Sequence, residues 1–173
     1  MTLVGQTEGV EKYAARLYRL AYLNNDTKKT LTITGIDVNN DIDYPNFNIT
    51  GSSSIQGMNV VIGSKAAENY GIEIGQTISI TTAAWGSPIL NRTYELSVIG
   101  IYYPLASTTS IEIFTDLATV QDMSGLQNKI GYIFVKVTDS AKVTEIRDRL
   151  QEKLGIEFNV LAPKVEAQQR IQS

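Results

Sequence analysis

The sequence predicts an α+β protein in which both ends of the chain form one layer of strands and helix, with a small β-rich subdomain inserted between them. Three observations carry this prediction: a long N-terminal hairpin, short strands through the middle of the chain, and a strand–helix–strand pattern near the C-terminus. A strand–helix–strand unit implies a right-handed crossover, and the hairpin is a natural partner for its sheet. We expect the layer to comprise residues 1–44 and 119–173 and the insert to comprise residues 45–118.

The first element, residues 10–23, is compatible with two structures. Its apolar residues fall at helical spacing, but residues 16–23 can also form a strand with aromatic side chains on one face. The turn-forming cluster at 24–29 and the alternating β-formers at 30–36 favour the strand, because a hairpin accounts for both halves.

The middle of the chain is predicted to combine loops with short elements. Residues 38–58 are rich in Asn, Asp, Ser and Gly and are expected to form a loop. Ser64 opens a brief helix that Gly71 ends, since a glycine suits the left-handed position after a helix. We expect strands at 60–62, 77–81 and 94–101, with a hairpin tip at 83–88.

The C-terminal part is predicted to alternate strands and helices. Apolar residues spaced along 143–154 mark one face of an amphipathic helix that ends at Gly155. An earlier helix begins at Thr115 or Asp116 and stops at Gly125. We expect strands at 111–114, 130–137 and 156–161, followed by a polar, weakly helical tail at 164–171.

Composition excludes several classes of function. The net charge is −3 and the pI is about 5.0, which gives no electrostatic attraction to nucleic acid. The chain has no cysteine and no histidine, so thiol chemistry and the commonest general base are absent. No segment reaches the ~20 apolar residues of a membrane span, so the chain as given is expected to be soluble.

One acidic segment has the spacing of calcium ligands. Asp37, Asn39, Asp41 and Asp43 occupy alternate positions, as in an EF-hand loop. The loop's required glycine is replaced by Ile42, and the twelfth position does not hold glutamate. We therefore interpret the segment as an acidic loop, and we expect no metal-binding, cofactor-binding or catalytic residue.

Three apolar residues are candidates for contact with a partner or substrate. Trp85, the only tryptophan, lies at the expected hairpin tip, where it could anchor a partner or fold back over a small β domain. Tyr103 and Leu105 follow a strand and present the same two alternatives, with core packing favoured.

Several stretches together resemble the MacB-like periplasmic core domain of FtsX/MacB-type permeases. Residues 59–78, NVVIGSKAAENYGIEIGQTI, are similar to the family's strand–Gly–helix–Gly segment, although Gln76 stands where an acidic residue is usual. Four further segments, ITGID at 33–37, LSVIGI at 96–101, FTDLATVQ at 114–121 and IFVKV at 133–137, agree with the family in order and spacing.

The resemblance implies a porter-like layer formed by both chain ends, and an extracytoplasmic domain without catalysis of its own. In such transporters the permease acts as a homodimer or heterodimer with a cytoplasmic ATP-binding subunit, and the domain contacts an adaptor or an exported substrate. The domain would stand outside the cell membrane, in the periplasm or extracellular space. A free-standing extracellular binding or adhesion domain is the alternative, and an enzyme that uses only carboxylates is a third hypothesis.

Overall fold

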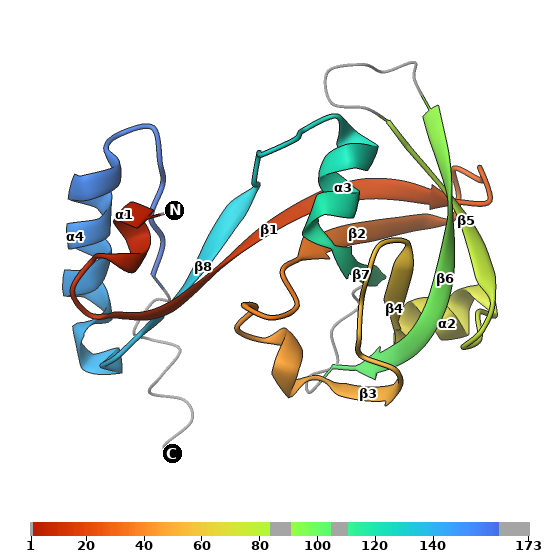
Figure 1. Cartoon of the computed structure of the whole chain (residues 1–173), viewed down its shortest axis with the longest axis horizontal. Coiled ribbons are helices and arrows are strands. Elements are labelled where there is room, and N and C mark those ends of the chain that lie inside the picture. Colours follow the sequence, from red (N-terminus) through yellow and green to blue (C-terminus); the bar gives the residue numbers. More distant parts are fainter. Residues whose placement is uncertain (1, 84–90, 105–110, 163–173) are drawn as a thin grey trace. The chain divides into compact units, whose positions relative to one another are not determined.

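The computed structural model describes residues 2–83, 91–104 and 111–162. Within these ranges the chain forms a mixed α+β domain, as the sequence predicts (Figure 1). The helices are α1 (Thr2–Gly5), α2 (Ser64–Tyr70), α3 (Leu117–Ser124) and α4 (Val143–Leu154). The strands are β1 (Val10–Leu23), β2 (Thr30–Ile36), β3 (Asn48–Gly51), β4 (Asn59–Gly63), β5 (Thr77–Ala83), β6 (Asn91–Tyr103), β7 (Glu112–Asp116) and β8 (Tyr132–Val137).

The N-terminal hairpin is confirmed. β1 pairs antiparallel with β2, and the register runs from Arg16 opposite Ile36 to Tyr22 opposite Thr30. The turn between them places Asn24 at φ 52° and Asn25 at φ 56°, a left-handed pair that asparagine tolerates well. The helical alternative for residues 10–23 is therefore wrong.

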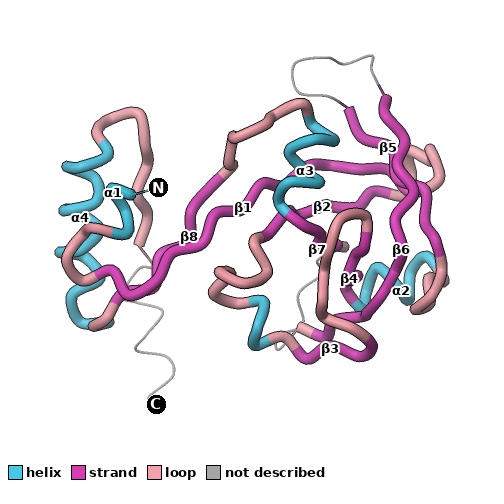
Figure 2. The backbone as a smooth tube through the Cα atoms, viewed as in Figure 1, coloured by secondary structure: helices cyan, strands magenta, loops and turns pink. Residues whose placement is uncertain are grey.

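Six strands form a closed ring. β1 pairs with β2 on one side and with β5 on the other, so the order β1-β2-β7-β4-β6-β5 returns to β1. The join between β1 and β5 is short, with Tyr22 opposite Thr81 and Leu23 opposite Ile80. β3 adds to β6, and β8 lies beside β1 in the sheet order. Figure 2 shows the strands of the ring following one another around a common interior.

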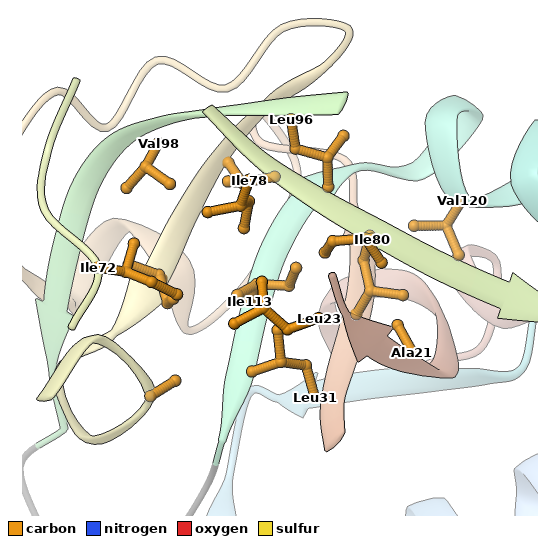
Figure 3. Packing of buried hydrophobic residues seen from close by; sticks show 14 of the residues in the cluster. Ala21, Leu23, Leu31, Ile72, Ile78, Ile80, Leu96, Val98, Ile113 and Val120 are labelled. Carbon is orange, nitrogen blue, oxygen red and sulfur yellow. The ribbon is translucent and has the colours of Figure 1, made fainter. Parts of the chain in front are cut away.

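The main core fills the ring. Alternate residues of each strand point to one face, and in a closed ring that face is the interior. Figure 3 shows these side chains converging from different strands. Burying each large aliphatic side chain contributes about 1.5–3 kcal/mol. The strands supply Leu17, Ala21, Leu23, Leu31, Ile33, Val60, Ile62, Ile78, Ile80, Leu96, Val98 and Ile113, and the helices α2 and α3 add Ala66, Ala67, Val120 and Met123.

A second, aromatic cluster covers the outer face of the ring. Phe114 of β7 and Tyr102 of β6 point outward and contact Phe47, which follows β2 in a long connection. The rings of Phe47 and Tyr102 stack with centroids 5.2 Å apart. The connection at 38–58 is thus more than the loop expected from its composition, since it also forms β3 and buries Tyr44.

The expected last strand at 156–161 is wrong. After α4 the described chain continues in turns and irregular structure to Ala162, with no further strand. The side-chain amide of Gln151 donates to the carbonyl oxygens of Gly155 and Phe158, both at 2.8 Å, and accepts from the backbone N–H of Val160. These bonds satisfy groups that a strand would pair with a neighbour. Ile156 is fully exposed, so its alternation with Phe158 reflects no buried face.

The chain divides into two compact units. One combines the residues up to Tyr13 with those from Val135 onward, and the other is Ala14–Phe134. In the first unit, Ile146 and Leu150 form the buried face of α4, as their spacing predicts. The boundaries expected from the sequence, 1–44 with 119–173 and 45–118, differ from these and stay a prediction.

Candidate functional site

Of the three residues predicted to contact partners, the structure describes one. Trp85 and Leu105 lie outside the described residues. Tyr103 ends β6 and pairs with Asn48 of β3. Its side chain is 44% exposed, whereas the neighbouring Tyr102 is buried at 3%. Because successive side chains of a strand point to opposite faces, Tyr102 enters the aromatic cluster on the outer face of the ring, whereas Tyr103 lies on the other face of β6, with Ile101 and beside α2.

Tyr103 lines a hollow between α2 and β6, which we call the α2–β6 hollow. It has a volume of about 550 Å³ and opens to solvent. β6 contributes Ile101 and Tyr103, and α2 contributes Ser64, Ala67 and Glu68. The turn that follows α2 supplies Gly71, Ile72 and Glu73.

The local sequence explains why the hollow forms. α2 begins directly after β4, with Gly63 at its N-cap, and it ends at Gly71 in the left-handed conformation with φ 63°. A glycine at that position lets the chain reverse without the steric cost of a Cβ atom. The reversal directs Ile72 into the core, where it is 6% exposed, and leaves Glu73 at the surface.

The charge around the hollow is acidic. Glu68 is exposed and forms an ion pair with Lys65 at 2.9 Å, one turn away on α2. Glu73 is exposed, and its carboxylate forms no ion pair with the residues that the structure describes. None of the described lining residues is basic. The hollow therefore combines an apolar floor, an exposed aromatic ring and two carboxylates.

A buried ion pair lies elsewhere in the same unit. Arg16 of β1 donates from Nε to Asp41 Oδ2 at 2.8 Å and from Nη2 to Asp41 Oδ1 at 2.7 Å. The two side chains are 7% and 0% exposed. The guanidinium carbon lies 4.5 Å from the ring centroid of Phe134, a cation–π distance, and Nη2 also reaches Asp43 at 3.2 Å. This pair fastens the 37–44 segment to β1.

Hydrogen bonds set the protonation of this pair. Burial alone would raise the pKa of Asp41, but the hydrogen bonds from Arg16 and from the backbone N–H groups of Tyr44 and Asp43 outweigh it and lower that pKa. Burial would lower the pKa of Arg16, yet Asp41 raises it overall. Burial also raises the pKa of the nearby Tyr44 hydroxyl. Both members of the pair are therefore charged at neutral pH.

The acidic segment is used for structure. Asp41 is committed to Arg16, and Asp37 accepts hydrogen bonds from the backbone of Asn39 and the side chain of Asn40. In the described ranges no three acidic side chains gather as a metal site would require. The carboxylates of Asp37 and Asp41 accept hydrogen bonds from backbone N–H groups of the turns that follow them.

Sequence reasoning missed the residues that shape the hollow and the pair. Glu68 was indistinguishable from any exposed helical residue, and Glu73 from any turn residue, because their proximity depends on how α2 folds onto β6. Arg16 offered one signal: a charged residue within an otherwise apolar stretch of β1 needs a partner if it is buried.

Comparisons with known proteins agree on the fold. The family model of the MacB-like periplasmic core domain matches residues 2–153. No curated protein sequence matches the chain. No helix in the described parts of the chain is long and apolar enough to cross a membrane.

Three solved structures are similar to this chain. The extracellular domain of the noncanonic ABC-type transporter YknZ from Gram-positive bacteria has a TM-score of 0.61 at 14% identity, covering 88% of this chain and 80% of its own. The periplasmic region of MacB from Actinobacillus actinomycetemcomitans has a TM-score of 0.61 at 13% identity, with coverages of 99% and 81%. A domain of a permease protein from Porphyromonas gingivalis has a TM-score of 0.51 at 15% identity, with coverages of 99% and 88%. At these identities the similarity shows a shared fold, and the match of the family model over nearly the whole chain shows that it belongs to the MacB-like periplasmic core domain family, as an extracytoplasmic domain of an ABC-transporter permease.

Proposed function

We propose that this domain transmits ATP-driven motion from the cytoplasmic side of a permease and contacts substrate or partner proteins during export. The observation that carries the proposal is the family match over residues 2–153. The ATP would be hydrolysed by a separate cytoplasmic subunit, and the domain itself would perform no catalysis. The permease would act as a homodimer or heterodimer, with an adaptor or an exported molecule as a further partner.

The division of the chain supports a mechanical role. Within the described residues, those up to Tyr13 and those from Val135 to 162 form one unit, so the N-terminal segment and α4 belong to the same unit. We propose that this unit, with α1 and α4, is part of the porter-like layer expected at residues 1–44 and 119–173. β1 and β8 each continue from this unit into the other, so two strands link them covalently. A strand transmits displacement along its axis better than a flexible loop does.

Location is tested in intact cells with the full-length protein. A Thr27→Cys substitution places one thiol in the exposed turn between β1 and β2, in a domain with no cysteine of its own. Other cysteines of the full-length protein would be replaced first. We expect a membrane-impermeant maleimide to label this variant from outside. Ala21→Cys, at a position that is 0% exposed, is the control and should react only after denaturation.

Labelling of Thr27→Cys only after lysis would place the domain in the cytoplasm and overturn the proposal.

The coupling between ATP hydrolysis and motion of this domain is tested on the purified transporter with its ATPase. We expect backbone hydrogen exchange within this domain to differ between the nucleotide-free state and a state trapped with ATP. Identical exchange throughout the domain in both states would contradict a role in transmitting motion.

A further inference from the structure

We propose that the α2–β6 hollow binds a basic side chain of a polypeptide, held between Glu68 and Glu73 with its aliphatic part against Ile101 and Tyr103. The inference names a binding site for the partner or substrate contact of the proposed function, and it rests on that function for its biological setting. Its physical basis is the hollow alone, so it can be tested on the isolated chain.

The lining of the hollow selects a cation with an apolar stem. Ala67 and Ile72 form a nearly fully buried floor, and Ile101 is half-buried beside it. Tyr103 presents an exposed ring at the edge of the hollow. A lysine or arginine side chain suits such a surface because its methylene groups pack on apolar residues while its charge stays in water. The ring of Tyr103 offers the same cation a favourable face.

The two carboxylates of the hollow determine that its ligand carries a positive charge. Glu68 is a residue of α2 (Ser64–Tyr70) and Glu73 belongs to the turn after that helix, and both line the same hollow. None of the described lining residues is basic, and the nearby Lys65 is already paired with Glu68, so an anionic group such as a phosphate or a carboxylate would meet net repulsion from the two glutamates. A cation would meet two carboxylates, one of which has no ion-pair partner among the described residues.

Lys65 acts as an internal competitor for the site. Its ammonium group lies 2.9 Å from Glu68, but the side chains are 51% and 72% exposed. An exposed pair of this kind contributes little, so a ligand cation can displace it. Removing Lys65 should therefore strengthen ligand binding, an effect that a purely structural role of these residues would not produce.

The size of the hollow favours a polypeptide over a free amine. A volume of about 550 Å³ lies within the range of sites that hold drug-sized molecules. It far exceeds the volume of one side chain. Because the hollow opens to solvent, a segment of chain could pass across it with one basic residue inserted.

The experiment measures binding of a defined probe to the whole 173-residue chain. The probe is the peptide acetyl-Gly-Leu-Lys-Leu-Gly-amide, and the comparison peptide has norleucine in place of lysine. Binding is followed through the methyl NMR signals of Ile72 and Ile101. We expect the lysine peptide to shift these signals and the norleucine peptide to bind at least tenfold more weakly. Binding should also weaken as salt is raised, since exposed charges are screened.

Substitutions in and near the hollow then test whether the peptide binds there. The double change Glu68→Gln/Glu73→Gln should weaken binding of the lysine peptide roughly tenfold, the combined effect of two exposed charge contacts. Lys65→Met should tighten binding about two- to threefold. Glu95→Gln, which removes an exposed carboxylate of β6 that does not line the hollow, is the matched control and should leave the affinity unchanged.

Equal affinity for the two peptides, or an unchanged affinity in the double variant, would overturn the inference. So would peptide-induced shifts that leave Ile72 and Ile101 unaffected. The outcome is separable from that of the proposed function. Labelling of Thr27→Cys from outside, together with a hollow that does not distinguish lysine from norleucine, would leave the transporter role standing and remove only this site.

Discussion

Arg16 shows how a single charged residue organises its surroundings. Its guanidinium is held by Asp41 through two hydrogen bonds and stacks near Phe134. A buried pair of this kind adds little net stability compared with an apolar pair of the same shape, but removing one partner leaves an uncompensated charge. The pair therefore specifies where the 37–44 segment lies on β1 more than it stabilises the fold.

We predict that Asp41→Asn destabilises the domain by about 3 kcal/mol at neutral pH, because Arg16 then remains buried and charged without a counter-ion. For a domain of this size the Tm should fall by roughly 6–12 °C. Asp43→Asn is the control: that carboxylate also reaches Arg16, but it is 52% exposed, and its loss should cost less than about 1 kcal/mol. Equal effects of the two variants in thermal unfolding would show that burial of the pair is unimportant.

The same pair predicts a dependence on pH. The folded state lowers the pKa of Asp41 below that of the unfolded chain, which is about 3.9. The stability due to ionised Asp41 is thus fully present above about pH 5 and is lost as the pH falls through the folded pKa. The difference in unfolding free energy between the wild type and Asp41→Asn should be constant from pH 7 to 5 and shrink below about pH 4. Urea unfolding at each pH measures it, and a difference that grows with acid would refute the assignment.

At the scale of elements, β3 approaches β6 unusually closely. β3 pairs with the end of β6, and Gly51 lies opposite Gly100. A Cβ atom at Gly100 would lie 2.5 Å from the carbonyl oxygen of Ser52, a distance that real Cβ atoms do not show. The two glycines allow the connection at 38–58 to fold back over the aromatic cluster. Glycine within a strand often marks such a close approach of two backbones.

We predict that Gly100→Ala costs about 2–3 kcal/mol in unfolding free energy, because the backbone of β3 must move away from β6. Gly131→Ala is the matched control. Its nearest neighbour, the carbonyl oxygen of Arg16, would lie at 3.4 Å, an ordinary contact, so the change should alter stability by less than about 0.5 kcal/mol. Chemical denaturation of both variants decides the matter, and similar losses would contradict the steric explanation.

The elements that could be predicted from sequence are those with a strong local signal. The hairpin of β1 and β2, the helices α2, α3 and α4, and their glycine ends were recognisable because turn residues and spacing act locally. β3 could not be predicted, since its pairing depends on distant Gly100. The expected strand at 156–161 failed because Gln151, on the preceding helix, satisfies its backbone groups instead.

For the whole molecule, the closed ring could not be read from the chain. Alternation within each strand predicts a buried face, but it does not say which strands are neighbours. The ring needs β1 to pair with both β2 and β5, and β2 to pair parallel with the distant β7. The candidate site depends on the same long-range arrangement, which explains why Tyr103 was a candidate from its own sequence context while Glu68 and Glu73 were not.

We predict that the two units differ in local stability. α4 buries only Ile146 and Leu150 in its own unit, whereas β4 and β7 lie within the large core of the ring. Native-state hydrogen exchange should therefore give a lower opening free energy for the α4 amides than for those of Val60, Ile62 and Ile113. Equal opening free energies in the two sets would show that the chain unfolds as one cooperative unit.

The way β1 is held in the ring has a mechanical consequence. A pull along β1 loads seven consecutive residue pairs with β2 in shear, so their hydrogen bonds must yield together. Its two pairs with β5 form a much shorter seam. A tensile load on the strand would therefore open the ring first between β1 and β5 while the hairpin stays intact. The fold thus combines a strongly paired hairpin, β1–β2, with a weakly paired join, β1–β5. This combination would let the ring open between β1 and β5 under load and close again when the load is released.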